Sequence, residues 1–210
     1  MNNNQGLTPQ TGLFIIHASA QIPAVDIYAN SMQVNRESFV YGQNSEGYLG
    51  LTPNLYSFNF STAGTQNILV SQSDSLGVFK LYSLILYDSL PSPRLMCIQD
   101  NFSQASTTSS NWRFLDLSPD IPWMNVFLDH AEVFDSRTFA DNLGAPALDT
   151  FLKVSPGSHQ VILQYPSGGD TIQYQSTFNF TTGNVFTVYS SGFGSRNDSL
   201  GLRLNLTQNF

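Results

Sequence analysis

Three residues near the start of the chain have the side chains of a hydrolytic triad, namely His17, Ser19 and Asp26. A serine hydrolase uses a histidine to take the proton of the serine hydroxyl and a carboxylate to orient that histidine. No G-x-S-x-G nucleophile turn surrounds Ser19, and His17 and Ser19 share one side of an extended strand only if that strand stays regular through Ala18. The residue types therefore permit hydrolysis, whereas their spacing does not specify it.

Nearly the same stretch recurs further along the chain with different chemistry. HASAQIPAVDIY begins at His17 and DLSPDIPWMNVF begins at Asp116, a separation of 116 − 17 = 99 positions. The alignment pairs Ser19 with Ser118, Pro23 with Pro122, and Asp26 with Asn125. Because the second copy loses the histidine but keeps the serine and proline, we expect a structural motif. Its Ser, Asp and Asn side chains should hydrogen-bond loop backbone groups that the strands leave unpaired.

The elements that must position these residues have the pattern of short strands. In LYSFNFS, Tyr56, Phe58 and Phe60 fall on one face, which is the period-two pattern of a half-buried strand. A turn is expected near Asn30, and a short helical piece only around 138–143. About seven strands per 100 residues predict an all-β chain. We expect two tandem immunoglobulin-like or transthyretin-like antiparallel β-sandwich domains.

The repeat predicts how the 210 residues are divided. Residues 1–11 are expected to form a flexible N-terminal tether, 12–101 the first β-sandwich repeat, 102–110 a Ser/Thr-rich linker, and 111–210 the second repeat. Two interpretations of the linker stay open: it lets the two domains move independently, or an apolar interface locks them together.

Composition argues against several classes of function. The formal charge is −7 and the basic residues are scattered, so a nucleic-acid groove is not expected. Cys97 is the single cysteine, which rules out an intramolecular disulfide, and no Cys/His set has zinc-ligand spacing. Cys97 lies in the apolar run LMCI and is expected to be a buried structural thiol. No cofactor is expected.

Four acidic residues raise the question of a calcium ion between the domains. They are Asp100, Asp116, Asp120 and Asp129. Their oxygens are suitable calcium ligands, but the chain has no EF-hand loop pattern. We therefore favour their interpretation as solvated loop acids, and no metal site is predicted.

Trp123 occupies a loop where the first copy carries Ala24. An exposed indole can stack on the apolar face of a sugar ring, and Tyr165 or Tyr174 could extend such a platform. We favour the alternative that Trp123 packs at the domain interface or in the core, because large aromatic side chains are usually well buried. Trp123 and Asp120 are nevertheless the candidate binding residues, since they lie in the Asp120 to Met124 loop.

The repeated segments resemble the DUF4397 family of bacterial envelope proteins. The family's first strand carries an HASPDAP-VDV motif, which residues 17–27 match closely and residues 116–126 match in part. The resemblance covers the whole chain as two tandem copies. It implies a secreted or lipid-anchored β-sandwich protein, with no established activity and no catalytic residue that can be carried over to this sequence.

We therefore expect a non-enzymatic binding or structural interaction module of the bacterial cell envelope, either an outer-membrane lipoprotein or a secreted protein. Its partner would be an unknown surface protein or a glycan. Membrane tethering would come from an N-terminal lipidation signal that has been removed from this sequence. One alternative is a carbohydrate-binding accessory lipoprotein. The second alternative is a hydrolase that uses His17 and Ser19.

Overall fold

The computed structural model describes residues 10–101, 107–143, 151–167 and 169–209. Most of the expected tether (residues 1–9) and of the expected linker (residues 102–106) lies outside these ranges. The first half contains β1 (Thr11–His17), β2 (Val25–Ala29), β3 (Met32–Gln33), β4 (Leu49–Leu51), β5 (Asn54–Thr62), β6 (Ile68–Leu76), β7 (Leu81–Tyr87) and β8 (Arg94–Gln99). The second half contains β9 (Ser110–Asp116), β10 (Met124–Leu128), β11 (Ala131–Arg137), the 3-10 helix η1 (Phe139–Leu143), β12 (Leu152–Val154), β13 (Gly157–Ser167), β14 (Asp170–Phe180), β15 (Val185–Ser191) and β16 (Arg203–Gln208).

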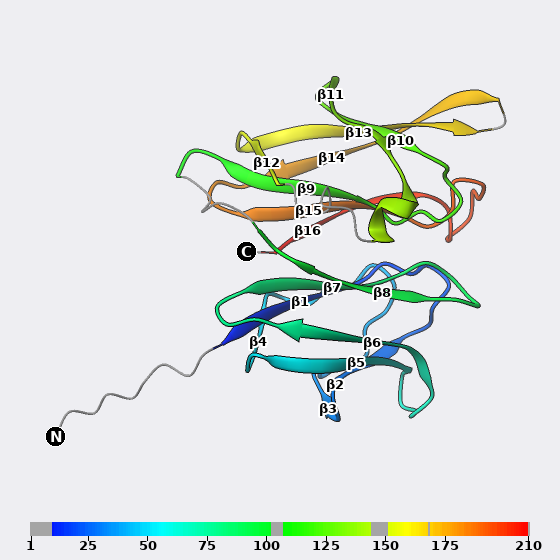
Figure 1. Ribbon diagram of the computed structural model, residues 1–210. Coiled ribbons are helices and arrows are strands. Elements are labelled where there is room, and N and C mark those ends of the chain that lie inside the picture. Colours follow the sequence, from blue (N-terminus) through cyan, green and yellow to red (C-terminus); the bar gives the residue numbers. More distant parts are fainter. Residues whose placement is uncertain (1–9, 102–106, 144–150, 168, 210) are drawn as a thin grey trace.

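Each half is a sandwich of two four-stranded sheets, and the strand order is the same in both (Figure 1). The first half has the orders β4-β1-β7-β8 and β3-β2-β5-β6, and the second has β12-β9-β15-β16 and β11-β10-β13-β14. The predicted fold class is confirmed. The observed sheets differ from the expected antiparallel sandwiches in one respect. β1 pairs with β7, and β9 with β15, in parallel.

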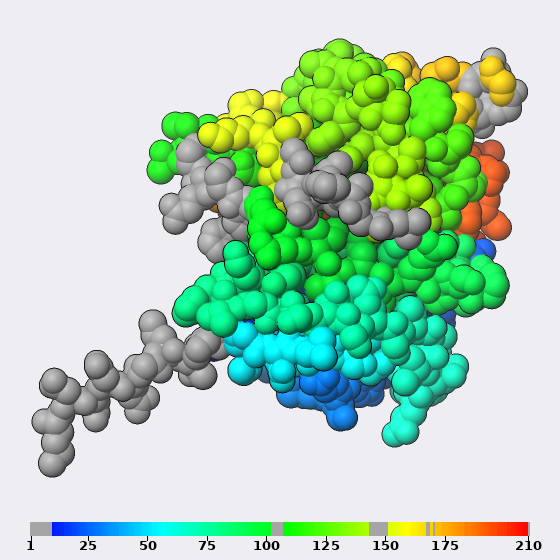
Figure 2. Space-filling model, in the orientation of Figure 1, coloured from blue at the N-terminus to red at the C-terminus, as the bar shows by residue number. Residues whose placement is uncertain are grey.

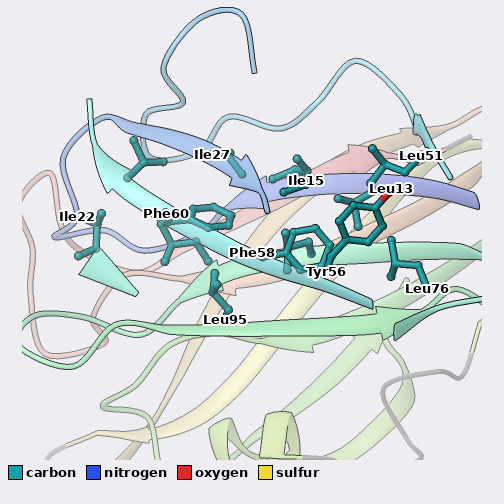
Figure 3. Close-up of a cluster of buried hydrophobic side chains, with 14 residues drawn as sticks. Leu13, Ile15, Ile22, Ile27, Leu51, Tyr56, Phe58, Phe60, Leu76 and Leu95 are labelled. Carbon is teal, nitrogen blue, oxygen red and sulfur yellow. The ribbon is translucent and has the colours of Figure 1, made fainter. Parts of the chain in front are cut away.

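Sequence alternation builds the core of the first sandwich. Leu13 and Ile15 of β1 and Phe58 and Phe60 of β5 are buried and face one another between the two sheets (Figure 3). Ser57 and Asn59 alternate with these buried aromatic side chains and so lie half-buried on the outer side of β5. The predicted period-two pattern of this strand is confirmed.

The second sandwich has an equivalent but more aromatic core. Trp112 and Phe114 of β9 are fully buried against Phe180 and Phe186. The rings of Trp112 and Phe180 meet edge to face with their centroids 6.0 Å apart. Such aromatic pairs contribute about 0.5–1.5 kcal/mol beyond the area that they bury.

The two sandwiches pack against each other through the sheets that contain β1 and β9 (Figures 1 and 2). Both strands are buried along their whole length, because one face lies in its own core and the other lies in this interface. Phe14 and Ile16 from the first half and Leu115 and Tyr189 from the second belong to one buried cluster. An apolar interface therefore joins the halves, rather than a linker alone.

Loops from each half also reach across to the other half. The ring of Phe139, in η1, packs on Tyr87 of β7 with centroids 5.5 Å apart. Conversely, the Tyr41 hydroxyl lies 2.7 Å from the Ser191 hydroxyl of β15, and Arg203 covers the Tyr41 ring. The short helix expected around 138–143 is therefore present, and its first residue contributes to the interface.

Candidate functional site

The structure places His17, Ser19 and Asp26 with three different sets of partners. His17 Nε2 lies 3.3 Å from the Pro23 carbonyl oxygen, and the Ser19 hydroxyl donates to the Asp88 carbonyl oxygen at 2.5 Å. The Asp26 carboxylate accepts from the Ser38 hydroxyl at 2.6 Å and from the Gly64 N–H at 2.8 Å. No hydrogen bond links the three residues, so they do not form a proton relay.

His17 is also unsuited to act as a general base. The side chain is fully buried, and this burial lowers its pKa to about 4. Its Nδ1 atom has no hydrogen-bond partner among the described residues, so no carboxylate orients the ring. His17 is therefore neutral at pH 7 and fixes the loop before β2 through Pro23.

At the equivalent position of the second half, Asp116 is buried as well. Its Oδ1 accepts hydrogen bonds from the Ser190 hydroxyl at 2.7 Å and from the Ser118 N–H at 3.0 Å, whereas Oδ2 has no partner in the described part of the chain. Burial raises the pKa of Asp116 to about 7, although these two hydrogen bonds lower it in part. A carboxyl group in this setting holds its proton near neutral pH.

The remaining residues of the repeated motif differ in their bonding. Asn125 Oδ1 accepts from the Ser136 N–H at 2.9 Å, in the neighbouring strand rather than in a loop. For Ser118 the expected bond to a loop backbone group is wrong, because its hydroxyl is buried without a partner among the described residues. Pro23 and Pro122 are exposed at the entrances to β2 and β10, where a missing N–H is tolerated.

The four acidic residues do not gather around one point. Asp120 accepts hydrogen bonds from the backbone N–H groups of Gly194 and Ser195, while Asp129 lies 2.5 Å from His159 Nδ1. No group of three or more metal-ligating side chains is found among the described residues. Our interpretation as solvated loop acids is wrong for Asp100 and Asp116, which are both buried.

Asp100 instead forms an ion pair across the interface between the halves. Arg113 of β9 places Nη1 2.8 Å from Asp100 Oδ1, and both side chains are fully buried. The distance defines an ion pair, but the Nη1 N–H is not aligned for a hydrogen bond. We therefore assign this contact to Coulomb attraction, which is stronger in a buried site than in water.

Hydroxyl groups from both halves surround this ion pair. Arg113 donates to Ser83 of β7 at 2.8 Å and to Thr187 of β15 at 3.1 Å. The Tyr48 hydroxyl donates to Asp100 at 2.7 Å. Burying a charge is costly unless it is paired and hydrogen-bonded, so this network fixes how the two sheets register against each other.

In the loop that carries the candidate binding residues, Asp120 is held by hydrogen bonds and Trp123 is exposed to solvent. Asp120 holds the 192–201 loop through Gly194 and Ser195, and a Cβ atom at Gly194 would come within 2.8 Å of Ile121. Trp123 is 38% exposed. The favoured expectation that Trp123 packs at the interface or in the core is wrong, because its side chain is exposed and belongs to none of the three buried clusters.

Tyr165 and Tyr174, which were expected to extend an aromatic platform with Trp123, pack against the second core instead. Tyr165 is only 5% exposed and belongs to the second core, and Tyr174 packs against the same core. Both line a hollow of about 250 Å³ together with the 194–202 loop. Tyr165 is therefore mainly a core residue.

Cys97 is half-buried on β8. Burial raises the pKa of its thiol above the ordinary value, and the negative charges of Asp74 and Asp100 add to this effect. A thiol with a raised pKa is a poor nucleophile, because the thiolate is the reactive form.

In the part of the chain that the structure describes, no helix has the length and apolar character of a membrane span.

Comparison with protein families agrees with the family resemblance of the sequence. Residues 11–127 match the family model described as a domain of unknown function, DUF4397. The match covers more than half of the chain, which belongs to this family. It extends from β1 to β10 and so runs past the end of the first sandwich.

Comparisons with individual proteins add little. No curated protein sequence matches the chain. Among solved structures, it is similar to one described as a candidate cell adhesion protein from Bacteroides fragilis, at 9% identity and a TM-score of 0.24. That similarity covers 96% of this chain and 98% of the other.

Sequence reasoning missed the residues that join the two halves. Arg113 stands between Trp112 and Phe114 in a strand of otherwise buried pattern, and this is the one signal that could have indicated a buried cation. Its partner Asp100 lies at the far side of the expected linker. Nothing in the spacing of these two residues predicts that they meet.

Proposed function

We propose that this chain is a non-enzymatic binding or structural interaction module of the bacterial cell envelope. The observation that carries the proposal is the separate use of His17, Ser19 and Asp26, each of which hydrogen-bonds a different structural partner. A side chain whose polar atoms hold loops in place is not available for acid, base or nucleophilic chemistry. Function then rests on noncovalent recognition by exposed surfaces.

Two further observations support this proposal. The buried interface, which includes the Arg113–Asp100 ion pair, favours one rigid body that presents loops from both sandwiches. Rigid surfaces bind at a lower entropic cost than mobile ones. The chain belongs to the DUF4397 family. The resemblance of its repeated segments to secreted or lipid-anchored members of that family supports an extracytoplasmic location.

Co-sedimentation with isolated bacterial cell walls tests the proposal. The purified chain should bind in a saturable way and be recovered with the walls, while a denatured sample and an unrelated acidic β-sandwich should stay in solution. Recovery of the native chain entirely in the supernatant, over a range of wall concentrations, would contradict the proposal.

Carbohydrate binding through Trp123 is the second candidate, and the exposure of this indole favours it. Stacking of an exposed aromatic ring against a sugar needs no conformational change. Trp123→Ala should then lower the recovery with cell walls at least tenfold without changing the unfolding midpoint. Equal recovery of the variant and the wild type would exclude Trp123 as the contact.

A further inference from the structure

The outer sheet of the first half has a hollow on the side that faces away from its core. Tyr28 of β2 pairs with Asn59 of β5, and Ser61 of β5 pairs with Ile68 of β6. Since Phe58 and Phe60 point into the core, Asn59 lies on this outer side. Ser61, which follows an irregularity in the β5–β6 register and is only 2% exposed, lines the bottom of the hollow. The hollow has a volume of about 360 Å³, within the rough range of 300–1,000 Å³ that small-molecule sites occupy.

The second half provides a matched comparison, because the same register there carries different side chains. Phe127, Ile162 and Gln164 stand where the first half has Tyr28, Asn59 and Ser61. Ile162 is only 5% exposed. Small floor residues on β5 therefore leave space that larger residues occupy on β13.

The lining of the hollow is uncharged in a chain whose net charge is −7. It includes Tyr28, Asn30, Asn59, Ser61, Gln66 and Ile68. The nearby acid Asp26 directs its two oxygens to Ser38 and Gly64. A charged ligand would find no opposite charge among these lining residues, whereas amide and hydroxyl groups match neutral ligands that both donate and accept hydrogen bonds.

The position of the hollow argues against a peptide as its occupant. A peptide that adds to a sheet needs an edge strand with unpaired backbone groups. Here the floor strand β5 lies between β2 and β6 and pairs with both. Recognition must therefore come from side chains, with Tyr28 and Ile68 providing apolar contact on either side of the polar floor.

We infer that this hollow is a binding site for a short neutral saccharide. Sugar hydroxyls would hydrogen-bond the amide groups of Asn59 and Gln66 above the small Ser61 side chain, and the apolar face of a ring would pack on Tyr28. This inference rests on the proposed binding function and assigns it a ligand class and a site distinct from Trp123.

Calorimetric titration of the full chain with cellobiose, lactose and N,N′-diacetylchitobiose tests the inference. At least one disaccharide should give saturable heat. Ser61→Gln, which places the residue of the second half in the floor, should weaken that affinity at least tenfold, and Tyr28→Ala should do the same. Ile172→Ala, at an exposed apolar side chain of the second half outside the hollow, should leave the affinity unchanged, and circular dichroism should give the same spectrum for all variants.

Two results would overturn the inference. One is the absence of saturable heat with all three disaccharides, and the other is unchanged affinity in both Ser61→Gln and Tyr28→Ala. Cell-wall recovery separates this failure from that of the proposed function. If the wild type and Ser61→Gln are recovered equally with the walls while no disaccharide binds, the hollow is not the site and the binding function stands.

Discussion

The last residue of β1 in the first sandwich is His17, and the last residue of the equivalent strand β9 in the second sandwich is Asp116. Both side chains are buried, and both are fixed by hydrogen bonds to nearby groups. Burial disfavours the charged form of each, which lowers the pKa of the histidine and raises that of the aspartate. The comparison teaches that this position requires a polar hydrogen-bonding side chain rather than a particular chemistry.

The interface contains a second difference between the halves. Phe14 of β1 and Arg113 of β9 are also separated by 99 positions, and both point toward the opposite sandwich. Phe14 packs on Tyr48, with ring centroids 5.7 Å apart, whereas Arg113 lies 4.8 Å from the Phe151 ring centroid. One half places an apolar side chain at this position and the other a buried cation, so the interface is asymmetric in charge.

Among the substitutions considered, removing the partner of the buried Arg113 cation should lower the free energy of unfolding most. Asp100→Ala leaves the Arg113 cation buried without its partner, which we expect to lower the free energy of unfolding by about 3–5 kcal/mol. Urea unfolding followed by fluorescence measures this loss. Asp198→Ala, which removes an exposed ion pair with Arg196, is the control and should leave the urea midpoint nearly unchanged.

The Arg113→Met, Asp100→Leu double variant sharpens the test. Since replacing a buried ion pair by apolar residues of similar volume is often neutral, the double variant should recover much of the stability lost by Asp100→Ala. A double variant that is less stable than Asp100→Ala would show that the ion pair itself holds the halves together.

The Asp116 carboxyl should give the second half a distinct pH dependence. Because its pKa is raised to about 7 in the folded state, the folded protein holds a proton that the unfolded chain has lost. This contribution to stability is present below about pH 4 and is lost as the pH rises through 7, by an amount on the order of 4 kcal/mol. Because His17 titrates in the opposite sense in part of this range, the difference in unfolding free energy between the wild type and Asp116→Asn isolates the effect. Measured by urea unfolding, that difference should fall by about 2–3 kcal/mol between pH 5 and pH 8.

The His17 imidazole should act in the opposite direction. Its pKa of about 4 in the folded state lies below the ordinary value, so stability is present above about pH 6.5 and is lost as the pH falls toward 4, by roughly 3 kcal/mol. Asparagine at this position cannot titrate, so His17→Asn should remove this contribution and leave the opposite fall caused by Asp116, which makes the unfolding free energy decrease with pH between pH 4 and pH 6.5. An unchanged slope between pH 6.5 and pH 4 in His17→Asn would contradict this assignment.

Truncating the exposed indole should change stability least. Trp123→Ala removes a side chain that is 38% exposed, so we expect a loss of less than about 1 kcal/mol. Trp112→Ala is the matched control, because the same substitution in the core should cost about 3–5 kcal/mol. Comparable losses in the two variants, measured by urea unfolding, would mean that Trp123 is buried in solution.

The sequence was informative where structure is local. Alternation in 55–61 predicted β5, the 99-residue repeat predicted two similar sandwiches, and residues 138–143 were identified as the site of a short helix. The strand and the helix depend on neighbouring residues alone, and the repeat on comparing two segments of the same sequence. The parallel pairing of β1 with β7 joins strands from the two ends of the first half, so alternation within either strand could not reveal it.

The candidate site was harder to predict, because burial there depends on distant segments. Arg113 alternates with Trp112 and Phe114, so the pattern alone would place it in solvent, and only the opposite sheet buries it. Trp123 was expected to be covered because of its size, but whether a loop residue is covered depends on its neighbours in space. The hollow beside Tyr28 depends on side-chain volumes across three paired strands.

The most direct test of our account measures binding and turnover together. The wild type and Ser19→Ala would be incubated with isolated bacterial cell walls at pH 7, and both the sedimented protein and the soluble sugar or peptide released would be quantified. We predict saturable binding with the same dissociation constant for both proteins and no release above the protein-free control. Release by the wild type that Ser19→Ala abolishes, or no binding by either protein, would contradict a binding module whose triad-like residues serve structure.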